Sequence, residues 1–126
     1  MKRFVTAIVL FAITIAACVA ETIFLDNTVS SFSQDITDAT KEVDNEDIDY
    51  AMQLTDNIAN NWQEEQAFIS TFINHDRLEE IGQSIISMKI NLEKGQIEDF
   101  FVESEVAKMQ LNHLRDTEFP SIQNIL

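Results

Sequence analysis

Residues 78–92 read LEEIGQSIISMKINL, and this stretch decides the fold class. Its apolar side chains recur at alternating steps of three and four residues, at Leu78, Ile81, Ile85, Met88 and Leu92. That spacing predicts an α-helix with one apolar face, which Ile86 and Ile90 widen. Lys94-Gly95 ends the predicted helix, because glycine readily adopts the left-handed conformation that follows a last turn.

Similar apolar stripes lie on both sides of this segment. They predict helices over residues 22–43, about 47–73 and 97–114. The stripe residues are Ile23, Val29, Phe32, Ile36, Ala39 and Val43 in the first helix, Ile48, Ala51, Thr55, Ile58, Trp62, Ile69 and Ile73 in the second, and Ile97, Phe100, Phe101, Ala107, Leu111 and Leu114 in the last. Leu54, Phe68 and Phe72 broaden the second stripe, so we expect that helix to contact more than one neighbour.

Short polar segments separate the predicted helices. Asp44-Asn45-Glu46-Asp47 precedes the second helix, Asn74-His75-Asp76 precedes the third with Asp76 as its expected cap, and Glu118-Phe119-Pro120 stops the last. Short turns make neighbouring helices antiparallel. With two glycines and one proline in 126 residues, the chain also lacks the turn residues of a β-sandwich or barrel. We therefore predict an all-α fold, in which an N-terminal membrane helix is followed by a small antiparallel bundle of three to four helices.

The N-terminus carries a membrane signal. Lys2 and Arg3 precede residues 4–20, FVTAIVLFAITIAACVA, which contain no charge. At about 1.5 Å per residue this run rises roughly 25 Å, near the lower limit for crossing a bilayer core. Basic residues stay in the cytoplasm, so we expect residues 1–21 to form the membrane segment and residues 22–126 an extracytoplasmic domain on a bacterial plasma membrane.

Three processing routes fit this segment. It is an uncleaved signal anchor that continues into the first bundle helix, a lipoprotein signal, or a cleaved signal peptide. The lipoprotein interpretation rests on Ile15-Ala16-Ala17-Cys18, which has the arrangement that bacterial lipoprotein processing requires and would place a lipid on Cys18. Cys18 is also the only cysteine, so the chain forms no internal disulfide.

The predicted domain is strongly acidic. The whole chain has a formal net charge of −14. All 22 acidic residues follow Ala20, together with six of the eight basic ones, so the charge after Ala20 is −16. Such a surface repels phosphates, which argues against nucleic-acid binding and against adsorption to anionic lipid headgroups.

Several short motifs resemble a known family. They are Trp62, the run from Phe68 to Glu79 (FISTFINHDRLE) and the terminus SIQNIL at residues 121–126. In these motifs, and in its basic-led membrane segment and acidic helical region, the chain resembles the domain-of-unknown-function family numbered 4363 of spore-forming Firmicutes. The resemblance implies a small membrane-attached helical protein and no activity. Its signature positions here, of unknown role, are Trp62, Asn74, His75, Leu78 and Asn124, and Cys18 departs from its pattern.

No motif carries recognisable catalytic chemistry. His75 and Glu79 share a helical face, but a zinc site needs three or four ligands, usually several of them His or Cys. The acidic clusters lack the glycine-containing loop that wraps calcium, and there is no Ser-His pair or glycine-rich phosphate loop. We expect no catalytic residues, no metal site and no cofactor.

These features favour a non-enzymatic function. We expect an accessory or scaffold protein that binds another membrane or envelope protein through its helical surface, with no nucleic-acid partner. The alternative is an extracytoplasmic sensor or binding module for a cation or a small ligand. Self-association into a homo-oligomer is compatible with either hypothesis.

Overall fold

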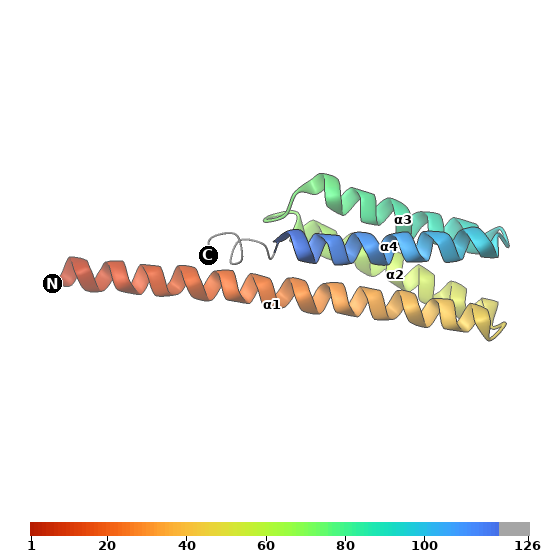
Figure 1. Cartoon of the computed structure of the whole chain (residues 1–126), viewed down its shortest axis with the longest axis horizontal. Coiled ribbons are helices and arrows are strands. Elements are labelled where there is room, and N and C mark those ends of the chain that lie inside the picture. The colour runs from red at the N-terminus through yellow and green to blue at the C-terminus, as the bar shows by residue number, and fades with distance from the viewer. Residues whose placement is uncertain (119–126) are drawn as a thin grey trace.

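The computed structural model of the chain describes residues 1–118, without the side chain of Glu118. These residues form four helices: α1 (Lys2–Asp44), α2 (Ile48–Ile69), α3 (His75–Glu93) and α4 (Ile97–Glu118). Figure 1 shows the first half of α1 projecting far beyond the other three helices, which pack beside its second half. The predicted all-α fold is confirmed, including the direct continuation of the apolar segment into the first bundle helix. The expected stop at Pro120 and the signature residue Asn124 lie outside the described residues.

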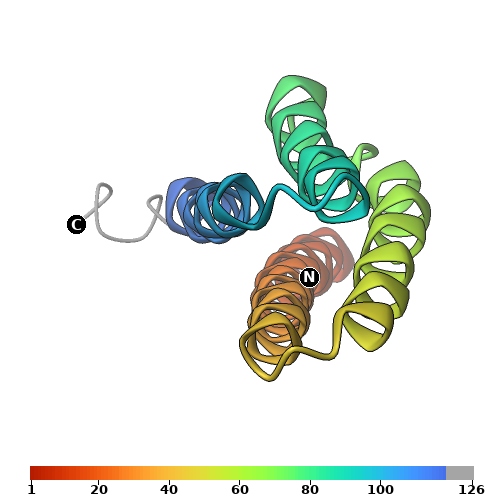
Figure 2. The same ribbon diagram turned by 90° about the vertical axis from the view of Figure 1, so that its right-hand side faces the viewer.

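The helices form an antiparallel bundle in chain order. α1 packs against α2, α2 against α3, α3 against α4, and α4 back against α1. Figure 2, which looks along the bundle, shows the short turns that link consecutive helices. Because each turn reverses the chain, the α2–α3 turn and the C-terminal end of α4 lie at the end of the bundle from which α1 projects (Figure 1). The α1–α2 and α3–α4 turns lie at the opposite end.

Local side-chain chemistry sets the helix ends. Asp47 caps α2, where its carboxylate accepts a hydrogen bond from the amide of Tyr50 at 3.2 Å. The expected cap Asp76 is wrong: Asn74 caps α3, and its side-chain oxygen accepts from the amide of Asp76 at 3.0 Å. Asn74 takes this position because its extended backbone, at ψ 124°, lies immediately before the first helical residue. Gly95 has φ 73°, which confirms the predicted glycine stop.

The second helix is shorter than the sequence predicts. It ends at Ile69 instead of Ile73, and the chain continues to Asn74 as a turn. Hydrogen bonds from the amides of Phe72 and Ile73 to the carbonyl of Ile69 hold this turn, so Ile73 still reaches the core. The apolar stripe therefore extends past the end of the helix.

The predicted stripes supply most of the core, with instructive exceptions. The prediction that Ile23 belongs to the apolar stripe is wrong, because its side chain is 55% exposed. Leu25 is 3% exposed and begins the buried stripe of α1. Two residues rotate a helix by about 200°, so Ile23 lies opposite Leu25. Ile86 and Ile90 also lie outside the core, at 54% and 41% exposure. Phe68 is 57% exposed, so it belongs to the surface as well.

Candidate functional site

A groove of about 520 Å³ runs between α2 and α3. Small residues form part of its floor: Ala59 from α2 and Gly82 from α3. A Cβ atom at Gly82 would lie 3.2 Å from Nε1 of Trp62, so the glycine permits a close approach that alanine would crowd. The exposed side chains of Ile86 and Ile90, one helical turn apart, give the groove an apolar edge. The remaining lining residues are Asn60, Trp62, Gln63, Gln66, Ile85, Lys89 and Glu93.

Trp62 lies in the wall of this groove. It is 2% exposed and packs edge-to-face against Phe32 of α1, with ring centroids 5.2 Å apart. Its Nε1 is buried and has no hydrogen-bond partner among residues 1–118. An unpaired buried donor costs about 1–3 kcal/mol. The groove therefore combines an apolar edge with the indole N–H of Trp62, a donor that forms no hydrogen bond among the described residues.

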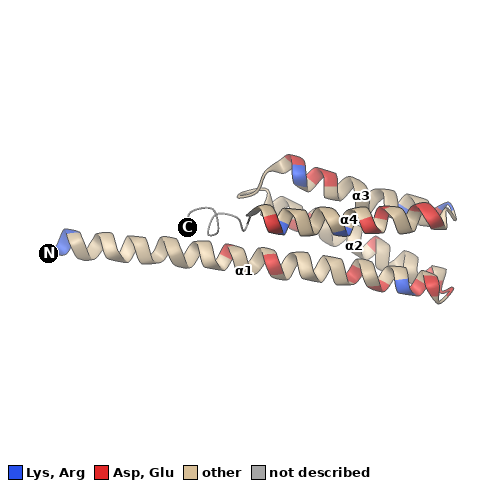
Figure 3. Ribbon diagram, viewed as in Figure 1, with Lys and Arg blue, Asp and Glu red and all other residues tan. Residues whose placement is uncertain are grey.

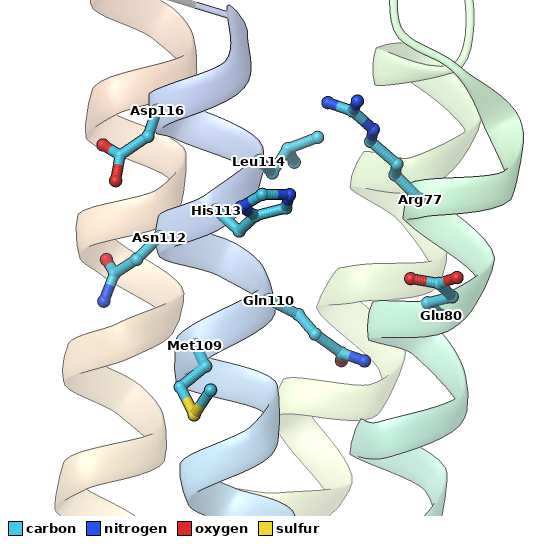
Figure 4. Close-up of a pocket in the computed structure, with 8 residues that line it drawn as sticks. All are labelled: Arg77, Glu80, Met109, Gln110, Asn112, His113, Leu114 and Asp116. Carbon is cyan, nitrogen blue, oxygen red and sulfur yellow. The ribbon is translucent and has the colours of Figure 1, made fainter.

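A second cavity, of about 490 Å³, lies between α3 and α4. Figure 4 shows Arg77 and Glu80 from α3 and Gln110 and His113 from α4 around it. The remaining lining residues are Met109, Asn112, Leu114 and Asp116. The guanidinium of Arg77 donates to the hydroxyl of Thr117, and the amide oxygen of Gln110 accepts from the hydroxyl of Ser84 at 2.8 Å. The polar groups at this cavity are a guanidinium, an imidazole, amides and carboxylates, and they lie on a lining that is otherwise apolar.

A third hollow, of about 290 Å³, lies between α1 and α2 beside the carboxylates of Asp35, Glu64 and Glu65. Burial, and then the neighbouring charge of Asp38, raise the pKa of Asp35 above its usual value of 3.8. Among the described residues, no group of three or more His, Cys, Asp or Glu side chains has a geometry that would hold a metal ion.

The signature residues of the sequence gather around the α2–α3 hairpin. Trp62 lines the groove, Asn74 caps α3, and Leu78 is fully buried. His75 is exposed at the start of α3, and its Nε2 lies 3.0 Å from the Glu79 carboxylate, as the four-residue spacing predicts. Trp62, Asn74 and Leu78 thus stabilise the fold, and Trp62 also lines the α2–α3 groove.

The sequence singled out Trp62, Ile86 and Ile90 of the α2–α3 groove, but not Gly82 or the polar residues that line the α3–α4 cavity. Gly82 carried the one usable signal, because glycine inside a helix costs about 1 kcal/mol relative to alanine and marks a close approach. The pairing of Arg77 and Glu80 with Gln110 and His113 had no local signal, since it depends on how α3 packs against α4.

The projecting part of α1 is long and apolar enough to cross a membrane, by length and composition. Only 6% of its most apolar window is buried in the protein, so it differs from the core helix of a soluble bundle. Cys18 is exposed on this part.

The fold therefore defines a class: four-helix bundles built on an extended, apolar N-terminal helix. Residues 19–125 match the family described as Domain of unknown function (DUF4363), and the chain belongs to that family. No curated protein and no solved structure matches the chain.

Proposed function

We propose that this protein is a non-enzymatic accessory or scaffold protein, tethered by its N-terminus to a bacterial plasma membrane, whose bundle binds another membrane or envelope protein on the extracytoplasmic face. The observation that carries the proposal is the α2–α3 groove. It offers an apolar edge at Ile86 and Ile90 and an unpaired indole N–H at Trp62. Grooves of this kind accept the apolar face of an amphipathic helix.

The orientation is supported by charge. Lys2 and Arg3 precede the exposed apolar part of α1, and basic residues flanking a span stay in the cytoplasm. The continuous helix from Lys2 to Asp44 favours an uncleaved anchor, because it links the span to the bundle without a flexible segment. Intact-mass analysis tests this: a full-length mass supports the anchor, and a lipidated species beginning at Cys18 supports lipoprotein processing. Protease added to protoplasts should cleave the chain beyond Leu25, and protection of that region until lysis would refute the orientation.

Site-specific crosslinking in native membranes tests the binding surface. A photoreactive amino acid at Ile86 should give a discrete adduct with a membrane or envelope protein. The matched control is Val102, which is 60% exposed on α4 and lines none of the three cavities above. Adding Ile90→Asp, which places a charge on the exposed apolar edge of the groove, should abolish the adduct at position 86. Equal adducts at positions 86 and 102, or no adduct at 86, would refute the groove as the binding surface.

The α3–α4 cavity supports a second candidate function, as a binding module for a small ligand or a cation. A ligand that binds the folded chain raises its melting temperature. We expect Arg77→Gln and His113→Asn, which alter the polar lining, to abolish any such shift while leaving the melting temperature without ligand nearly unchanged. A panel of divalent cations and small carboxylates and phosphates that shifts neither the parent protein nor these variants would eliminate this candidate.

A further inference from the structure

Three phenylalanines gather where α1 leaves the bundle. Phe24 of α1 lies 5.3 Å from Phe68 and 6.5 Å from Phe72, measured between ring centroids, and Phe68 lies 5.9 Å from Phe72. Phe68 is in the last full turn of α2, and Phe72 is in the α2–α3 turn. Although the three rings contact one another, Phe68 remains 57% exposed. A crevice of about 330 Å³ beside them reaches Ala20, the last residue of the apolar segment, and the charged Glu21 that follows it.

The length of the span places this aromatic cluster at the membrane surface. A hydrocarbon core about 30 Å thick needs about 20 helical residues at about 1.5 Å each. Counted from Phe4, those residues reach Ile23, whose side chain is 55% exposed. The count includes one charged residue, Glu21, which lies about 3 Å before Ile23 along the helix axis and so at the headgroup edge of the span. Phe24 directly follows Ile23. Phe68 and Phe72, which contact it, therefore lie at the same level as the boundary between hydrocarbon and headgroups.

The charge distribution agrees with this placement. Residues 66–75, which form the end of α2, the turn and the first residue of α3, contain no Asp, Glu, Lys or Arg, and they are the longest such stretch after Ala20. Charged residues lie beside this stretch, at Asp76 and Arg77 of α3 and at Arg115 and Asp116 of α4. At the opposite end of the bundle, the α1–α2 turn contains Asp44, Glu46 and Asp47, and α4 begins with Glu98 and Asp99. Figure 3 shows the uncharged turn between charged residues at the start of α3 and at the end of α4, and acidic residues around the opposite end of the bundle. Because carboxylates are repelled by anionic headgroups, an uncharged turn can approach the bilayer where an acidic one cannot.

We propose that the exposed ring of Phe68, supported by the half-buried rings of Phe24 and Phe72, inserts into the interfacial region of the outer leaflet and holds the bundle against the membrane. The proposal rests on the membrane tether of the proposed function and adds a second, non-covalent contact with lipid. Phenylalanine side chains are among those that membrane-surface helices bury at the boundary between headgroups and acyl chains. Because both α1 and the α2–α3 turn contact the membrane, the bundle axis is fixed relative to the bilayer. The α2–α3 groove then faces partners in the same membrane.

Spin labelling of the full chain tests the contact. In a Cys18→Ala background, single cysteines replace Phe68, Thr71, Ile8 and Val102, and each variant is labelled with a nitroxide in liposomes that contain anionic lipid. Phe68, Thr71, Ile8 and Val102 are all exposed, so their replacement spares the core. Collision with oxygen reports lipid, and collision with a water-soluble nickel chelate reports solvent. We expect the ratio of oxygen to nickel accessibility at positions 68 and 71 to exceed that at 102 and to approach that at 8.

The control positions separate this proposal from its premise. If position 8 is in lipid while positions 68 and 71 match the water-exposed position 102, the interfacial contact is refuted and the tether stands. If position 8 is itself in water, both the tether and the interfacial contact are refuted. Position 71 retains all three phenylalanines, so a lipid-like ratio there supports the contact even if a cysteine at position 68 disturbs the cluster.

Discussion

Replacement of Trp62 separates the contribution of its ring from that of its indole N–H. Trp62→Ala removes a side chain that is 2% exposed, and truncating a buried aromatic residue costs about 3–5 kcal/mol. Trp62→Phe also loses volume, but it keeps a ring to pack edge-to-face against Phe32. It further removes a buried donor whose unmade hydrogen bond costs about 1–3 kcal/mol. These two effects oppose each other, so we expect Trp62→Phe to change the free energy of unfolding by less than about 1.5 kcal/mol.

Urea unfolding of the full chain in nanodiscs, followed by far-ultraviolet circular dichroism, measures both variants without relying on the only tryptophan. If Trp62→Phe destabilises the bundle as much as Trp62→Ala, the indole N–H is hydrogen-bonded within the protein. Its role in the groove would then be refuted. If a partner accepts the indole hydrogen bond, Trp62→Phe should lower the crosslinking yield at Ile86 while the bundle remains folded.

Three further predictions concern local structure, each measured by equilibrium unfolding of the full chain. Asn74→Ala should destabilise the bundle by about 0.5–2 kcal/mol through loss of the α3 cap, whereas Asn74→Ser should be nearly neutral. Gly95→Ala should cost about 1 kcal/mol of stability, because φ at Gly95 is 73°. Glu46 has a similar φ of 65°, so Glu46→Gly should be neutral or stabilising. The opposite order would refute the claim that both positions favour glycine. The pKa of Asp35 is higher in the folded chain than its usual value of 3.8, so the folded state favours the protonated carboxyl. The contribution of Asp35 to the free energy of unfolding therefore falls as the pH rises from 3.8 through the pKa of the folded state. Asp35→Asn should therefore stabilise the bundle at neutral pH, by less than about 1 kcal/mol, and have no such effect below pH 3.8; equal effects at both pH values would contradict the shift.

The residues that were predicted as signature positions have structural roles in the α2–α3 hairpin. Asn74 caps α3 and Leu78, in its first turn, is buried in the core, so both side chains stabilise the hairpin. Trp62 also belongs to the core, and it is the one signature residue in the described part of the chain that lines the groove. The signature thus combines the requirements of folding with a candidate binding feature.

The sequence alone determined the helices, because helical periodicity is a local property. The 3-4-3-4 spacing at Leu78, Ile81 and Ile85 predicted one buried face, and all three residues are at most 1% exposed. Gly95 marked a helix end through a backbone conformation that glycine adopts without steric cost. The apolar run after Arg3 likewise predicted a helix that no other element covers, and residues 1–20 are exposed.

Only the tertiary structure decided which side chains at the edge of a stripe are buried. Ile85 and Ile86 are adjacent and were both placed on the stripe of the third helix, but the packing of α3 against its neighbours buries Ile85 and leaves Ile86 54% exposed. The same holds for the site, since the groove exists because Gly82 of α3 lies beside Trp62 of α2. The aromatic cluster likewise joins Phe24 to Phe68, which are far apart in the chain. Periodicity fixes the face of each helix, whereas contacts between helices depend on packing angles and offsets that arise only when all the faces are buried together.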